Sequence, residues 1–110
     1  MVIADSQTQL LNDLRSAFIA GRVQWQKHAL AKMLERGISR SEIRQVVLAG
    51  EVIEFYAADR PFPSCLLLGY PDQKAVHVVA AFDSAIGIGY VITAYQPDLK
   101  HFLADDRTRR

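Results

Sequence analysis

The chain has 110 residues, 50% of them hydrophobic, and its formal net charge is +1. This length suits one small globular domain, whose core needs no cross-links. The single cysteine, Cys65, excludes an internal disulfide, and the apolar runs are too short for a membrane span. The N-terminal residues lack the basic and apolar regions of a signal peptide, so we expect a cytoplasmic protein with no membrane partner.

The first predicted element is a helix over residues 6–20, where apolar side chains recur at the spacing of an amphipathic helix. Ser6 and Gln9 have the spacing of a capping box, and Gly21 is placed to end the helix. We therefore expect residues 1–21 to form an extra N-terminal helix that packs on the rest of the domain.

The stretch HALAKMLERGIS, residues 28–39, predicts a second helix that ends sharply. Its apolar residues form one stripe, and Gly37 follows the last turn, where a left-handed residue closes a helix at little cost. Ser39 and Glu42 have the spacing of a second capping box. These signals predict a tight corner into a third helix, which ends before Gly50.

Strand patterns follow in the second half of the chain. The segments EVIEFY, SCLLLGY, AVHVVAAF and GYVITAY are rich in β-branched and aromatic residues, and turn residues connect them. Short connections imply antiparallel neighbours. The predicted class is α+β, with N-terminal helices packed on one face of a roughly four-stranded antiparallel sheet. The single domain spans residues 22–104, PDLKHFL is a candidate for a short helix, and residues 105–110 are expected to be a flexible tail.

Charge is distributed unevenly along the chain. Residues 22–47 hold six basic and two acidic side chains, whereas residues 48–106 hold three basic and eight acidic ones. A basic patch suits a phosphate ligand, and solvated lysines and arginines on helix surfaces explain the same pattern equally well. Composition alone leaves both interpretations open.

His28, Lys32 and Arg36 recur every fourth residue along the second predicted helix. They form one stripe at the border of its apolar face, a position that looks into the crevice beside a sheet. Lys32 and Arg36 repel each other slightly, and a bound phosphate would offset that repulsion. The stripe is either one wall of an anion site or a structural histidine beside two surface cations.

The predicted strands supply partners for this stripe. His77 lies in the third of them, and Thr93 and Tyr95 share a face of the last strand with Val91. Side chains of these types suit metal-free RNA cleavage, in which one group takes the proton of the ribose 2′-hydroxyl and another protonates the leaving 5′-oxygen. A cation stabilises the charged phosphate between them. Taken singly, a buried structural histidine and a surface tyrosine explain His77 and Tyr95 as well.

Other chemistries fit less well. The three histidines and Cys65 lack the short paired spacings of a structural zinc site, so no metal or cofactor is expected. Cys65 lies within an apolar strand, which predicts an inert core thiol. No helix follows Gly87 and Gly89, so GIGY is not a dinucleotide-binding loop.

The combined pattern resembles a family of small bacterial and archaeal proteins, domain-of-unknown-function family 4258. The resemblance runs from about Trp25 to Pro97 and rests on five segments in order: HALAKMLERGISRSEI, GEVIEFY, DRPFPSCLLLG, VHVVAAFD and VITAYQPD. That family in turn resembles the RelE-like and BrnT-like toxins, which are small ribonucleases with helices packed on an antiparallel sheet. The implied fold agrees with the α+β class predicted from the residues.

The resemblance implies a metal-independent endoribonuclease of a toxin–antitoxin system, with RNA as substrate and a small antitoxin protein as partner. The family's motif residues fall, in chain order, on His28, Arg36, His77, Thr93 and Tyr95. Lys32 stands where the family pattern suggests arginine. Lysine keeps the charge but loses the bidentate geometry with phosphate.

Two functions fit these residues. In the first, the chain is a toxin-type endoribonuclease. Its candidate catalytic residues are His28, Arg36, Tyr95 and His77. Its candidate RNA-binding residues are Lys32, Arg40, Arg60 and Thr93. In the second, the chain is a non-catalytic protein-binding module on the same fold, which the near-neutral charge favours because dedicated RNA binders tend to be more basic. The sequence leaves enzymatic activity and oligomeric state open.

Overall fold

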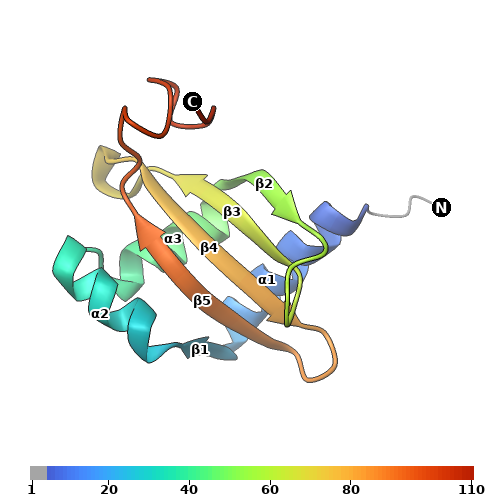
Figure 1. The fold of residues 1–110 in the computed structure, drawn as a ribbon. Coiled ribbons are helices and arrows are strands. Elements are labelled where there is room, and N and C mark those ends of the chain that lie inside the picture. The colour runs from blue at the N-terminus through green and yellow to red at the C-terminus, as the bar shows by residue number, and fades with distance from the viewer. Residues whose placement is uncertain (1–4) are drawn as a thin grey trace.

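A computed structural model describes residues 5–110, which form three α-helices and five strands in an α+β arrangement. The helices are α1 (Ser6–Ala20), α2 (Lys27–Arg36) and α3 (Arg40–Ala49). The strands are β1 (Val23–Trp25), β2 (Glu51–Tyr56), β3 (Ser64–Gly69), β4 (Val76–Asp83) and β5 (Ile88–Tyr95), and a short 3-10 turn, η1 (Pro71–Gln73), joins β3 to β4. Figure 1 shows α1 and α3 behind the sheet and α2 beside β5. The predicted α+β class is confirmed. Within the described part of the chain, no helix is long and apolar enough to cross a membrane.

The five strands form one mixed sheet in the order β1-β5-β4-β3-β2. Strands β2 to β5 are antiparallel neighbours, as predicted. Strand β1 pairs in parallel with β5, with Val23 opposite Gly89 and Trp25 opposite Val91. The prediction of a four-stranded, wholly antiparallel sheet is therefore wrong, because three residues between two helices carry too little periodicity to mark a strand.

A β-bulge in β5 decides which of its side chains face the helices. Val91 and Thr93 lie opposite consecutive residues of β4, so Ile92 between them is an extra residue. Val91 is buried in the core, whereas Thr93 and Tyr95 point to the opposite face of the sheet. The expectation that Thr93 and Tyr95 share a face with Val91 is wrong. Tyr95 instead lies opposite His77, on the face away from α1 and α3.

Helix α1 contributes directly to the core on the other face. Leu14 is fully buried, and both Leu14 and Ala17 lie against Gly89 of β5. The helix is capped by Asp5, whose carboxylate accepts a hydrogen bond from the backbone N–H of Thr8 at 2.7 Å. The predicted cap at Ser6 is therefore wrong by one residue, because Asp5 takes the extended conformation that a capping residue needs and Ser6 is already helical.

The corner between α2 and α3 has the predicted structure. Gly37 closes α2 with a left-handed φ of 67°. The Ser39 hydroxyl accepts from the Glu42 backbone N–H at 3.0 Å, and the Glu42 carboxylate accepts from the Ser39 N–H at 2.9 Å. Ile38, between Gly37 and Ser39, is buried. This corner sets the position of Arg36, the last residue of α2.

The sheet face away from α1 and α3 is covered in part by the C-terminal segment, residues 98–110. Phe102 is buried there, with its ring edge-to-face against His77 at a centroid distance of 4.6 Å. Arg109 donates from Nε to the Glu54 carboxylate of β2 at 2.7 Å. Aromatic packing and an ion pair thus hold this segment against the sheet.

The residues PDLKHFL, at 97–103, form turns and not the short helix that was a candidate there. The Asp98 carboxylate accepts the backbone N–H groups of Lys100 and His101, each at 3.0 Å, which favours a turn over a helix. Beyond this turn, Arg107 donates to the Glu51 carboxylate at 2.9 Å. The flexibility expected of residues 105–110 stays a prediction.

Cys65 lies in β3 with its side chain fully buried. Burial raises the pKa of its thiol to about 12, so the thiol stays protonated and unreactive at neutral pH. The prediction that Cys65 belongs to the core is confirmed.

Replacing Ser39 with alanine should lower the free energy of unfolding by about 1 kcal/mol, because the first turn of α3 loses its capping hydrogen bond. Urea unfolding measures the change. Ser41→Ala is the matched control, since Ser41 is exposed in the same helix and does not cap it. Equal effects of the two substitutions would contradict the capping role.

Candidate active site

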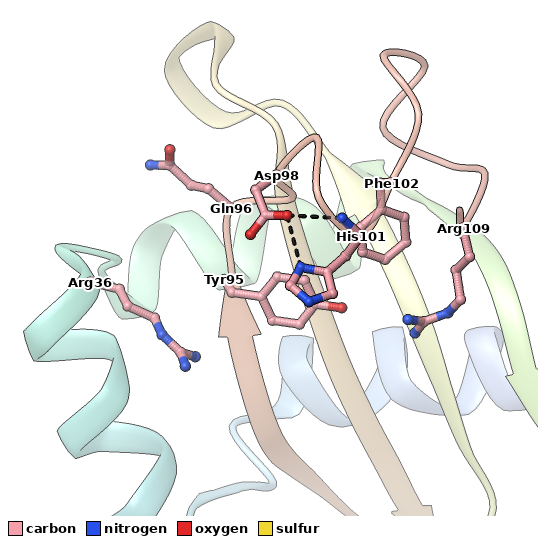
Figure 2. Close-up of a pocket in the computed structure, with 7 residues that line it drawn as sticks. All are labelled: Arg36, Tyr95, Gln96, Asp98, His101, Phe102 and Arg109. Carbon is pink, nitrogen blue, oxygen red and sulfur yellow. Dashed lines mark hydrogen bonds and ion pairs between the residues drawn. The ribbon is translucent and has the colours of Figure 1, made fainter.

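A pocket of about 590 Å³ opens where the last turn of α2, the end of β5 and the C-terminal segment meet (Figure 2). Its lining residues come from these three separate parts of the chain: Arg36, Tyr95, Gln96, Asp98, His101, Phe102 and Arg109. The pocket therefore exists only when the C-terminal segment lies against the sheet.

Arg36 reaches the pocket from the last turn of α2. Its Nη1 donates to the Ala94 carbonyl oxygen at 2.8 Å and to the Thr93 hydroxyl at 3.3 Å. Strand β1 ends opposite Val91, so this part of β5 has an edge that β1 does not cover, and the guanidinium occupies it. Arg36 is exposed, and among residues 5–110 no acceptor takes up its remaining N–H groups. These groups are available to an anion.

His77 lies opposite Tyr95, on the neighbouring strand β4, and is fully buried. Its Nε2 is 2.6 Å from the Asp106 carbonyl oxygen, and its Nδ1 is 3.4 Å from the Tyr95 hydroxyl. A carbonyl only accepts, so Nε2 carries the proton and Nδ1 is the acceptor that faces Tyr95. Burial lowers the pKa of His77, although the hydrogen bond to Asp106 acts in the opposite direction. The ring is therefore neutral and positions the tyrosine hydroxyl.

Tyr95 is half-buried at the end of β5 and forms part of the pocket wall. Its burial raises the pKa of the phenol, so the hydroxyl keeps its proton at neutral pH. The hydroxyl has one proton, so it can donate to a ligand beside Arg36 when it turns away from His77 Nδ1.

His101 and Asp98 form a hydrogen-bonded pair on the rim formed by the C-terminal segment. The Asp98 carboxylate accepts from His101 Nδ1 at 2.8 Å, and Figure 2 shows this contact beside the bond to the His101 backbone N–H. The hydrogen bond from the His101 side chain is the main cause that lowers the pKa of Asp98. Sequence reasoning treated His101 only as a scattered histidine, and the D-x-x-H spacing was the one local signal for the pair.

Arg109 closes the far side of the pocket. Its Nε donates to both oxygens of Glu54, at 3.0 and 2.7 Å, and its guanidinium carbon lies 4.9 Å from the centre of the Phe102 ring. The Tyr56 hydroxyl also donates to Glu54. The Glu54 carboxylate raises the pKa of Arg109, so the arginine remains charged but is largely neutralised by its partner. Its main contribution is to hold the C-terminal segment in place.

The structure does not bring His28 to this pocket. His28 is exposed in the first turn of α2, eight residues before Arg36 and thus about 12 Å away along the helix axis. Lys32, midway between them, forms an ion pair with Glu35 at 3.3 Å. The three residues of the predicted stripe therefore lie on one helix, but only Arg36 lines the pocket.

The remaining candidate RNA-binding residues lie in different places. Thr93 is beside Arg36, whose guanidinium it contacts. Arg40 lies over the Trp25 ring, at 5.3 Å from its centre, and Arg60 is exposed in the loop after β2. Within residues 5–110, no three His, Cys, Asp or Glu side chains lie close enough together to form a metal site.

The fold and the pocket define a small α+β domain with a hydrogen-bonding cleft at the end of its sheet, in which Arg36 is the cation without a carboxylate partner in the region that the structure describes. The family described as Domain of unknown function (DUF4258) matches residues 25–96, so the chain belongs to that family, as its motifs predicted. No curated protein matches the chain. The match includes Arg36, His77 and Tyr95 and ends before Asp98 and His101, so part of the pocket lies beyond the matched region.

Lowering the pH from about 7 to about 5 should reduce the stability that His77 contributes. Its pKa in the folded state is below the unfolded value of about 6.5, so the unfolded state takes up the proton first and stability is lost as the pH falls. Urea unfolding of the wild type and of His77→Gln should therefore show a difference in free energy that shrinks toward low pH. A difference that stays constant or grows would show that His77 is not held neutral in the folded protein.

Proposed function

We propose that this protein is a metal-independent endoribonuclease of the toxin type, and that the pocket is its active site. The observation that carries the proposal is the position of Arg36 and Tyr95 on one open pocket. A guanidinium with unused N–H groups and a protonated phenol match two requirements of phosphodiester cleavage, charge stabilisation and proton donation. The resemblance of the family to RelE-like and BrnT-like toxins supports the same reaction.

In the proposed reaction the ribose 2′-oxygen attacks the neighbouring phosphorus and the bond from phosphorus to the 5′-oxygen breaks. The products are a 2′,3′-cyclic phosphate and a free 5′-hydroxyl. The unused N–H groups of Arg36 donate to the non-bridging oxygens, where negative charge accumulates in the transition state. Tyr95 gives its proton to the leaving oxygen, for which the hydroxyl turns away from His77 Nδ1, the acceptor that it faces at 3.4 Å in the free protein.

A toxin of this kind acts on cytoplasmic RNA and is held inactive by an antitoxin protein, which we propose as the partner of this chain. Such a partner would block the reaction by covering the pocket or by occupying Arg36 with a carboxylate.

A second candidate function is protein binding without catalysis. Leu34, two residues before Arg36 on α2, is 86% exposed, and an apolar side chain this exposed is available to a partner protein. In this case Arg36 would serve only to cover the edge of β5.

Induced expression of the wild-type chain in bacteria should arrest growth and cleave cellular RNA, and Arg36→Ala should relieve both. Loss of one charge-stabilising donor typically lowers such a rate by about 10²- to 10³-fold, which purified protein would show on RNA substrates. Arg22→Ala is the matched control, because Arg22 is also an exposed arginine that donates to a backbone carbonyl, at 3.1 Å from Gly87 and away from the pocket.

The same assay tests the sequence-based role of His28. If the pocket is the active site, His28→Ala should cleave RNA as the wild type does, whereas a role for the whole stripe on α2 requires it to be inactive. Normal growth with every variant and with the wild type, at matched protein levels, would favour the binding-module function.

A further inference from the structure

We propose that His101 is the general base of the ribonuclease reaction and that Asp98 is its positioning residue. The proposal rests on the function proposed above, since it assigns the group that accepts the 2′-hydroxyl proton. Both residues line the same pocket as Arg36 and Tyr95 (Figure 2).

The contacts of His101 leave one ring nitrogen free to accept a proton. The carboxylate of Asp98 can only accept, so the hydrogen bond of 2.8 Å places the imidazole proton on Nδ1. Nε2 then carries the lone pair, and among the residues that the structure describes no donor contacts it. The His101 side chain is 70% exposed, so an RNA strand can reach this nitrogen.

The turn at residues 98–102, which carries Asp98 and His101, is fixed by its own hydrogen bonds and by the packing of Phe102. Asp98 accepts the backbone N–H groups of Lys100 and His101, and its own carbonyl accepts the Phe102 N–H at 2.9 Å. Phe102 is buried next to the His77 and Tyr95 rings. Because Phe102 follows His101 directly, its burial fixes where the imidazole stands relative to Tyr95.

The other two histidines do not satisfy these requirements. His77 is fully buried and uses both ring nitrogens within the protein. His28 does not line the pocket and lies two turns of helix away from Arg36. Of the three histidines in the chain, His101 alone combines a place on the pocket with an accessible ring nitrogen.

The proton balance of the step is complete with these groups. As the 2′-oxygen forms its bond to phosphorus, its proton passes to His101 Nε2, and the Tyr95 proton passes to the departing 5′-oxygen. His101 ends as an imidazolium, which the Asp98 carboxylate stabilises, and Tyr95 ends as a phenolate. Exchange with water returns both groups to their starting states.

The test is the pH dependence of RNA cleavage by the purified full chain, on free single-stranded RNA and on ribosome-bound messenger RNA. A protonated imidazole cannot accept a proton, so the wild-type rate should fall on the acid side. His101→Gln should lower the rate by about 10²- to 10⁴-fold and remove this acid limb. His28→Gln, measured in parallel, should keep it.

Asp98→Asn separates positioning from turn structure. The asparagine side-chain oxygen can still accept the two backbone N–H groups, while the negative charge beside the imidazole is lost. The rate constant kcat should fall by about tenfold or more while KM stays unchanged, because the imidazolium formed in the step loses the carboxylate beside it. Urea unfolding of each variant confirms that the fold is retained.

The outcomes distinguish the two proposals. If Arg36→Ala abolishes cleavage but His101→Gln keeps the wild-type rate and acid limb, the assignment of His101 is overturned. The pocket would then remain the active site. An unchanged kcat in Asp98→Asn would overturn the role of Asp98. No cleavage by the wild type on either substrate would overturn the ribonuclease function together with this assignment.

Discussion

One extra residue in β5, the bulged Ile92, determines the arrangement of the pocket. It reverses the alternation of side chains, so that Val91 enters the core while Thr93 and Tyr95 point to the other face of the sheet. Without the bulge, Tyr95 would point toward the helices and could not lie opposite His77. The end of β5 thus presents the hydroxyls of Thr93 and Tyr95 on the face of Arg36, while Val91, earlier in the same strand, lies in the core.

The second constraint is the return of the C-terminal segment over the open face of the sheet. Burial of Phe102 between aromatic rings and the ion pair of Arg109 with Glu54 hold it there. An exposed ion pair is worth little on its own, so the aromatic contacts are the stronger part of this attachment. They also complete the pocket, because the segment supplies most of its lining residues. The site is therefore coupled to the packing of the last residues of the chain.

The three histidines differ in environment more than in sequence context. His77 is held neutral by burial and is bonded at both nitrogens, His28 is solvated on a helix surface, and His101 is exposed with one nitrogen fixed by Asp98. A histidine can serve as a structural or as a proton-transfer group, and its surroundings decide which. This difference explains why residue type and spacing placed His28 and His77 among the catalytic candidates and passed over His101.

The sequence by itself determined the three helices, the corner from Gly37 to Glu42 and the antiparallel neighbours β2 to β5, because caps, turns and periodicity act between residues close together in the chain. Its ordered motifs also identified the family. It also named Arg36 and Tyr95 as candidates, and both line the same pocket. Only the tertiary structure decided that β1 pairs in parallel with β5 and that Ile92 forms a bulge. It also decided that His101 lines a pocket on the sheet face away from α1. All three features depend on contacts between segments that are distant in the chain. A single inserted residue or a three-residue strand leaves no local sequence pattern that would predict them.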